Sequence, residues 1–275
     1  MIGAGTMGHG IAQVAAMAGY EARLTDSDPE AVAAGWERIR VNLAGAVTRG
    51  KMTQESADAA IARVIPVASL NIAARDADLV IEAILEDLVV KQSLFQQLDG
   101  LGRDETIFAT NTSSLSVTRI ADATSRPGRV VGMHFFNPVH IMKLVEVITH
   151  PAIDADIVDA AREVAKKMGK TPIVVRDSPG FASSRLGVIL GLEAMRMLED
   201  GVASAADIDT AMELGYRHPM GPLRLTDLVG LDVRLAILEH LHRELGEAFR
   251  PPEILRRLVR DGKLGKKTGE GFYTW

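Results

Sequence analysis

The chain has 275 residues, of which 47% are hydrophobic, and its formal net charge is −5. This length suffices for one large hydrophobic core or two smaller ones, and the mildly acidic balance argues against nucleic acid as a partner. The chain contains no cysteine, which excludes disulfides, thiolate metal ligands and a cysteine nucleophile, and we expect no metal site.

No apolar stretch approaches the roughly 20 residues that a membrane-spanning helix needs. The first residues show neither a basic leader nor the apolar core of a secretory signal. We therefore expect a cytoplasmic protein with no membrane partner.

The first half of the chain alternates short β-branched runs with helical patterns, which predicts a parallel sheet with crossover helices. The expected strands are residues 22–25, 79–82, 107–110 and 130–133, and a later pair, 143–148 and 173–175, is expected to extend the sheet. Residues 29–63 read as an inserted helical hairpin that is interrupted near residues 50–53. Thr53 is the predicted N-cap of its second helix.

The pattern changes at residues 176–180, beyond which no convincing strand appears until the last few residues. Residues 185–200 are apolar almost all round, as in a helix buried on several faces, and Gly201 is a suitable stop. Further helices are expected at residues 204–214 and 223–245. The sequence therefore predicts two domains, an α/β domain over 1–177 and an all-α domain over 178–275.

A glycine pattern near the start predicts a nucleotide site. Gly3, Gly5 and Gly8, with Thr6 and Met7 between them, match G-x-G-x-x-G and lead into a predicted helix. In a Rossmann-type doubly wound sheet, such glycines allow a tight turn, close approach to a pyrophosphate and close packing of helix on strand. A glycine-rich turn without a ligand is the alternative.

Asp26 ends the next predicted strand and indicates which dinucleotide is bound. A carboxylate there accepts hydrogen bonds from a ribose 2′-hydroxyl and repels a 2′-phosphate, which favours NAD over NADP. Only Met1 and Ile2 precede Gly3. Either the first strand is nearly missing, or the translation start lies upstream.

His134 follows a predicted strand, at the edge where open α/β sheets bind their ligands. Glu146 lies twelve residues later in an apolar strand-like run, where a buried charge needs a partner. A carboxylate beside a histidine would select its tautomer and support its protonated form, so the two residues are a candidate acid/base pair. A structural histidine and an unrelated glutamate remain the alternative. The polar run at residues 109–114 is either turn and capping chemistry or a substrate-orienting loop.

Several motifs, in order, resemble the L-3-hydroxyacyl-CoA dehydrogenase family, especially its short-chain, 3-hydroxybutyryl-CoA type, over almost the whole chain. These motifs are residues 3–8, 82–86, 111–115, 134–138, 177–181, 219–222 and 265–273. The resemblance implies NAD-dependent oxidation of a 3-hydroxyacyl-CoA in fatty acid metabolism, including β-oxidation, by a homodimer.

Carried over position by position, the resemblance implies His134 as the base, Glu146 as its partner and Ser113 as a contact of substrate and nicotinamide. The implied contacts of NAD are Glu86, Lys91, Asn137 and Lys267. The helical hairpin would bind CoA through Asn42 and Arg49, which are seven residues apart and so are expected on one helix face. An exposed arginine that is only solvated is the alternative for Arg49.

One position departs from the family motif. Where the family has an asparagine just before Arg185, this chain has Ser184, which keeps a hydroxyl but loses the amide and its reach. Ser184 is therefore a candidate catalytic-site residue whose substrate contact is direct or through water.

Two other functions compete with this interpretation. One is an NAD-dependent dehydrogenase of a free hydroxy acid, such as a sugar acid, which would not need the CoA-binding hairpin. The other is a non-catalytic NAD-binding protein on a dehydrogenase scaffold, which Ser184 and the short first strand favour. This non-catalytic alternative is disfavoured by the intact glycine loop and by Asp26, Ser113, His134 and Glu146.

Overall fold

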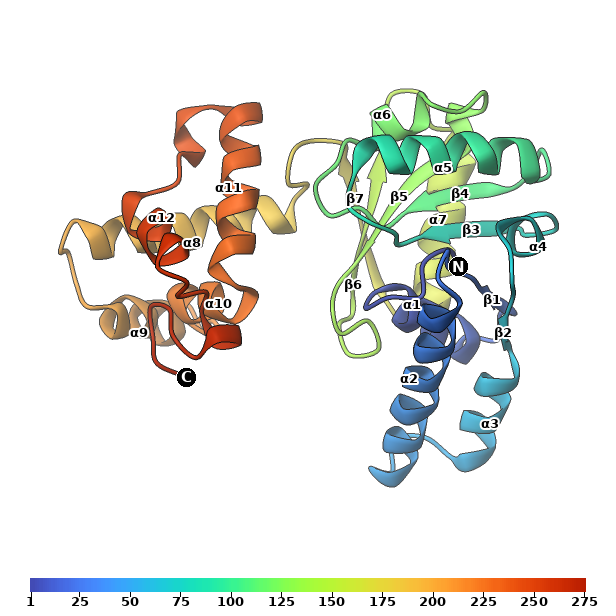
Figure 1. Cartoon of the computed structure of the whole chain (residues 1–275), viewed down its shortest axis with the longest axis horizontal. Helices are drawn as coiled ribbons and strands as arrows, with labels where there is room; N and C mark the ends of the chain where they lie inside the picture. Colours follow the sequence, from blue (N-terminus) through green and yellow to red (C-terminus); the bar gives the residue numbers. More distant parts are fainter. The chain divides into compact units, whose positions relative to one another are not determined.

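The computed structural model describes residues 1–275, and the chain separates into two units, Met1–Asp177 and Ser178–Trp275 (Figure 1). All seven strands lie in the first unit. No helix is long and apolar enough to cross a membrane.

The main sheet of the first unit has five strands. In spatial order they are β3 (Leu79–Glu82), β4 (Ile107–Thr110), β5 (Val130–Phe135), β6 (Leu144–Thr149) and β7 (Thr171–Arg176). A second ladder pairs β1 (Ala22–Leu24) with β2 (Val64–Pro66), a strand that the sequence did not predict. Ile2 forms parallel bridges to both Thr25 and Glu82, so it joins the two ladders and brings the glycine loop to the sheet's carboxyl edge.

Two strands of the main sheet, β6 and β7, run opposite to the other three. β5 and β6 pair antiparallel, whereas the other neighbours in the main sheet are parallel. The sequence predicted a parallel sheet extended by the strands at residues 143–148 and 173–175, and it predicted no direction for this later pair. Residues 136–143 connect β5 and β6 and are too few for the crossover of a dozen or more residues that a parallel pair requires.

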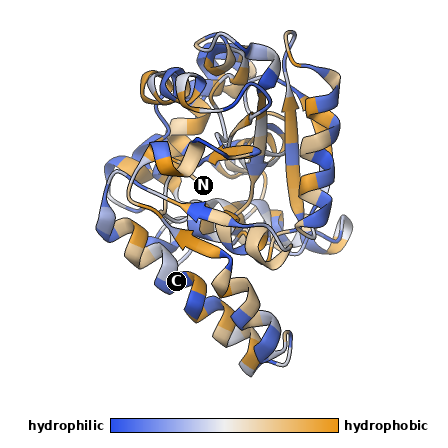
Figure 2. Ribbon diagram, turned by 90° about the vertical axis from the view of Figure 1, so that its right-hand side faces the viewer, coloured by the Kyte–Doolittle hydropathy of each residue, from blue (hydrophilic) through white to orange (hydrophobic).

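Helices cover both faces of the main sheet. Because neighbouring residues of a strand point to opposite faces, Ile81 and Val131 pack with α1 (Gly8–Met17) and α7 (Ala155–Lys167), whereas Val80 and Val130 pack with α5 (Leu88–Leu101) and α6 (Val117–Ala121). A short helix, α4 (Leu70–Ala74), joins the second group. Figure 2 shows the strands largely in the orange of hydrophobic residues, as expected for a sheet buried on both faces.

The inserted hairpin forms as expected and packs against α1. It consists of α2 (Pro29–Thr48) and α3 (Gln54–Ala62). The predicted N-cap is present, since the Thr53 hydroxyl accepts a hydrogen bond from the Ser56 amide at 3.1 Å. Buried Ile39 and Leu43 of α2 belong to the same apolar cluster as Ala12 and Ala16 of α1.

The second unit is helical. It contains α8 (Ser183–Glu199), α9 (Ala205–Gly215), α10 (Pro222–Val229), α11 (Leu231–Leu245) and α12 (Glu253–Arg260). The single helix predicted over residues 223–245 is wrong, because Gly230 has φ = 106° and both ends α10 and begins α11. A backbone in that region cannot continue a helix, and glycine adopts it without a steric penalty. Short 3₁₀ turns occur at Pro127–Arg129, Glu247–Phe249 and Lys266–Thr268.

Candidate active site

The three glycines of the loop before α1 serve different purposes. A Cβ at Gly8 would lie 1.7 Å from the carbonyl oxygen of Gly3, and one at Gly3 would lie 2.6 Å from that of Ala83. These two positions therefore require glycine for packing. A Cβ at Gly5 would meet nothing within 4 Å, so the backbone there faces open space. Thr6 and Met7 complete the turn into the N-terminus of α1, where amide groups and the helix dipole favour a phosphate.

Asp26 is attached to this loop. Its Oδ2 accepts a hydrogen bond from the Ala4 amide at 2.7 Å, and its Oδ1 accepts one from the Asp28 amide at 3.2 Å. Asp26 lies two residues after the end of β1 and is half-buried. An open backbone at Gly5 beside an anchored carboxylate fits a dinucleotide whose ribose carries a free 2′-hydroxyl.

His134 and Glu146 meet on adjacent strands. They are directly opposite each other in the β5–β6 register, and His134 Nδ1 lies 2.7 Å from Glu146 Oε2. The Glu146 side chain is fully buried and that of His134 is 7% exposed. The carboxylate thus selects the Nδ1–H tautomer and supports a positive charge on the ring.

A cavity of about 360 Å³ at the carboxyl edge of the sheet contains several of the predicted residues. Its walls include His134, Ser113, Asn137, Glu86, Lys91 and Met7. Phe136 also lines it, with its ring centroid 4.4 Å from that of His134. The cavity therefore brings together residues that follow β3 and β4 with residues at and after the end of β5.

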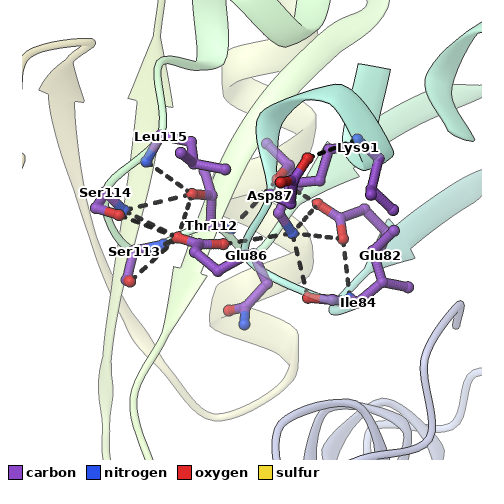
Figure 3. Close-up of polar contacts among 12 residues, drawn as sticks. Glu82, Ile84, Glu86, Asp87, Lys91, Thr112, Ser113, Ser114 and Leu115 are labelled. Carbon is purple, nitrogen blue, oxygen red and sulfur yellow. Dashed lines mark hydrogen bonds and ion pairs between the residues drawn. The ribbon is translucent and has the colours of Figure 1, made fainter. Parts of the chain in front are cut away.

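Glu86 organises the loop that carries Ser113 (Figure 3). Its Oε1 accepts hydrogen bonds from the Thr112 hydroxyl at 2.6 Å, the Ser113 amide at 2.9 Å and the Ser113 hydroxyl at 3.3 Å. The amide and hydroxyl of Ser114 donate to the same oxygen. Burial would raise the pKa of Glu86, but the Thr112 hydrogen bond, the charge of Lys91 and the Ser113 donors outweigh burial and hold the pKa below its usual value.

A buried ion pair lies behind Glu86. Lys91 Nζ donates to both oxygens of Glu82 at 2.8 Å and lies 3.5 Å from Glu86 Oε2. The Lys91 and Glu82 side chains are 1% and 0% exposed. Glu82 also accepts the Ile84 amide at 3.0 Å and the Thr110 hydroxyl. The loops after β3 and β4 are therefore tied to one charged cluster.

The remaining predicted residues lie elsewhere. Asn42 on α2 donates to Gln13 of α1 at 3.0 Å, whereas Arg49 is the exposed C-cap of α2. Neither lines the cavity. Ser184 and Lys267 belong to the second unit. Ser184 lies in the first turn of α8, and Lys267 pairs with Asp232 at 2.6 Å.

Three residues that shape this site had no individual role in the sequence predictions, although Asn111 and Thr112 belong to the polar run at residues 109–114. Glu82 holds Lys91, the Thr112 hydroxyl bonds Glu86, and Asn111 Oδ1 accepts the Phe135 amide at 2.8 Å, which joins the loops after β4 and β5. Glu82, like Glu146, is an acid in an apolar strand-like run, so the argument that identified Glu146 also applies to it. No cluster of three His, Cys, Asp or Glu side chains with the arrangement of a metal site is present.

Two family models match the chain. The NAD-binding domain of 3-hydroxyacyl-CoA dehydrogenase matches residues 1–178, and the C-terminal domain of the same enzyme matches residues 180–275.

Individual proteins match over nearly the full length. A probable 3-hydroxybutyryl-CoA dehydrogenase of Bacillus subtilis is 47% identical over 99% of this chain and 95% of its own. A 3-hydroxybutyryl-CoA dehydrogenase of Clostridioides difficile is 43% identical over 100% and 98%. The crystal structure of (S)-3-hydroxybutyryl-CoA dehydrogenase from Ralstonia eutropha superposes with a TM-score of 0.96 at 40% identity, covering 100% of this chain and 97% of that one. The chain belongs to the 3-hydroxyacyl-CoA dehydrogenase family.

Proposed function

We propose that the chain interconverts (S)-3-hydroxyacyl-CoA and 3-oxoacyl-CoA with NAD, and that its substrates are short, with 3-hydroxybutyryl-CoA and acetoacetyl-CoA as the expected pair. The observation that carries this proposal is the 2.7 Å contact between His134 Nδ1 and Glu146 Oε2 in the wall of a cavity that also contains Ser113. The names of the full-length relatives support the substrate class.

His134 is the proposed acid/base. In oxidation its imidazole takes the proton of the 3-hydroxyl as hydride leaves C3, and in reduction the imidazolium returns a proton to the 3-oxo group. Glu146 stabilises the imidazolium between these steps, and Ser113 holds the substrate oxygen. A positioned acid/base of this kind contributes about 10²- to 10⁴-fold to the rate.

The proposed cofactor contacts are the residues that the sequence predicted. The pyrophosphate and ribose would be bound by Gly3, Gly5, Thr6, Met7, Gly8 and Asp26. The rest of NAD would be contacted by Glu86, Lys91, Ser113, Asn137 and Lys267. NAD, when bound, supplies the hydride acceptor. The open backbone at Gly5 and the anchored Asp26 carboxylate support this assignment.

The proposed substrate contacts are Asn42 and Arg49 for CoA, and Ser184 for the acyl thioester. Arg49 is an exposed cation at the end of α2, which suits a CoA phosphate. Asn42 is bonded to Gln13 and would have to exchange that bond for one to CoA.

We also propose domain roles, a dimer and a location. Residues 1–177 would be the NAD-binding domain, and residues 178–275 would serve substrate binding and dimerisation. Leu186 and Leu190 are 64% and 43% exposed on one face of α8, which supports a homodimer through the second unit. Light scattering that gave a monomer mass would contradict it. The proposed location is the cytoplasm, and cell fractionation tests it.

The proposed reaction is tested by NADH consumption with acetoacetyl-CoA and with free acetoacetate in parallel assays. Consumption with the thioester alone is the expected result. Consumption with the free acid would favour the hydroxy-acid dehydrogenase instead. NADH binding without turnover of either compound would favour a non-catalytic NAD-binding protein.

A further inference from the structure

Beside the cavity that contains His134, the segment from β3 to α5 carries a charge cluster in which carboxylates outnumber ammonium groups, and Glu86 and Lys91 of this cluster line the cavity. Two carboxylates, Glu82 and Glu86, flank a single ammonium, Lys91 (Figure 3). Lys91 is bound by both oxygens of Glu82 at 2.8 Å, whereas Glu86 lies farther away, at 3.5 Å. Glu82 therefore takes most of the charge of Lys91, and Glu86 is the carboxylate left in excess.

Both carboxyl groups are surrounded by hydrogen-bond donors. Glu82 accepts from two groups that can only donate, Lys91 Nζ at both oxygens and the Ile84 amide at Oε2, and it also bonds the Thr110 hydroxyl. The amides and hydroxyls at Glu86 Oε1 also donate to it. A carboxylate accepts only, so these patterns fit the charged forms. The cluster then carries a net charge of −1, counted as two carboxylates and one ammonium.

If the chain binds NAD as proposed above, this excess charge affects the binding of the oxidised and the reduced cofactor differently. Hydride and proton leave the same carbinol group, so the nicotinamide ring has to enter the cavity that contains His134. Glu86 and Lys91 line the same cavity. The oxidised nicotinamide ring is a cation and the reduced ring is neutral, so a net negative wall stabilises only the oxidised form.

We propose that Glu82, Lys91 and Glu86 together set the preference of this site for NAD⁺ over NADH, and that Glu82 does so by neutralising Lys91. Without Glu82, Lys91 would pair with Glu86 and the cluster would become neutral. Glu82 thus acts on the cofactor through its neighbours, from a position with no exposed surface.

The test is the ratio of the dissociation constants of NAD⁺ and NADH, measured by calorimetric or fluorescence titration without substrate. Contacts common to both forms, including those of the pyrophosphate and ribose, cancel in this ratio. The contribution of the His134–Glu146 pair also cancels in comparisons between variants, because this pair is unchanged in every variant. In Glu82→Gln the ratio Kd(NAD⁺)/Kd(NADH) is expected to rise on the order of tenfold, because one negative charge is removed.

Two further variants separate charge from structural damage. The double variant Glu82→Gln with Lys91→Met restores a net charge of −1, so its ratio should return to within about twofold of the wild-type value. Glu86→Gln should raise the ratio as Glu82→Gln does. Asp104→Asn removes a fully exposed carboxylate on the same unit and should leave the ratio unchanged.

Three results would overturn the proposal, namely an unchanged ratio in Glu82→Gln, a double variant that keeps the shift, or an equal shift in Asp104→Asn. A wild-type protein that binds neither nucleotide would overturn the proposed function and this inference together. A wild-type protein that binds both NAD⁺ and NADH, with a ratio of dissociation constants that does not change in Glu82→Gln, would overturn this inference alone.

Discussion

Glu146 faces His134 across the antiparallel pair β5 and β6, with 2.7 Å between Oε2 and Nδ1. Both side chains project from strands in the interior of the main sheet, so sheet hydrogen bonds determine their separation. A pair supported in this way needs no loop closure to form. The buried charge of Glu146 is compensated in part by this contact.

Substitution of His134 by glutamine should abolish most turnover while leaving NADH affinity unchanged. Glutamine keeps a hydrogen-bonding side chain opposite Glu146 but cannot exchange a proton, so kcat should fall by about 10²- to 10⁴-fold. Steady-state kinetics and an NADH titration measure the two effects. The matched control is His242→Gln, because His242 also contacts a glutamate, Glu247, at 3.0 Å, but on the exposed surface of α11. Near-normal turnover in His134→Gln would remove this residue from the mechanism.

Asp26 should determine the preference for NAD over NADP. Asp26→Ser removes the charge that would repel a 2′-phosphate and the acceptor for a ribose hydroxyl. The ratio of kcat/KM for NAD to that for NADP is expected to fall by about 10- to 100-fold. Asp28→Ser is the control, since Asp28 is the N-cap of α2 and serine can replace it in that role. An unchanged ratio in Asp26→Ser would mean that the ribose is recognised elsewhere.

Most of the first unit could be predicted because its strands are short apolar runs that end in polar residues. No direction was predicted for β6, although the short connection after β5 contained the information. β2 has only three residues, two of them exposed, and therefore has no clear periodic pattern. Gly230 is one glycine within a helical pattern, and only its positive φ shows that two helices meet there.

Residues of the candidate site could be predicted where the residue type and its apolar neighbours are informative by themselves. Glu146 could be found because a buried acid needs a partner, and Glu82 could have been found by the same argument. The hydrogen bonds that Glu86 accepts from Thr112, Ser113 and Ser114 could not be predicted from the sequence. They depend on two loops that meet only when β3 and β4 pair. Asn42 and Gln13 are likewise 29 residues apart and meet only when the hairpin packs on α1.

Arg49 should contribute to CoA binding and not to hydride transfer. Arg49→Glu is expected to raise KM for acetoacetyl-CoA by about tenfold, since it replaces an attraction for phosphate by a repulsion. The kcat and the NADH dissociation constant should stay within about twofold of wild type, because Arg49 does not line the cavity. Arg40→Glu is the control, an exposed arginine of α2 paired with Glu37. A KM that does not change in Arg49→Glu would favour the free hydroxy acid as substrate.

Glu86 should stabilise the first unit in a pH-dependent way. Burial opposes its ionisation, but the Thr112 hydrogen bond, Lys91 and the Ser113 donors outweigh burial and lower the pKa from its ordinary 4.5. A carboxyl group whose pKa is lower in the folded protein contributes stability that is fully present above its unfolded pKa and is lost as pH falls through the folded value. The difference in Tm between wild type and Glu86→Gln should therefore be constant from pH 7 to about pH 5 and shrink below that. Thermal unfolding at closely spaced pH values measures it, with exposed Glu163→Gln as the control. A difference that stays constant down to about pH 3 would show that Glu86 acts on stability through packing and not through its charge.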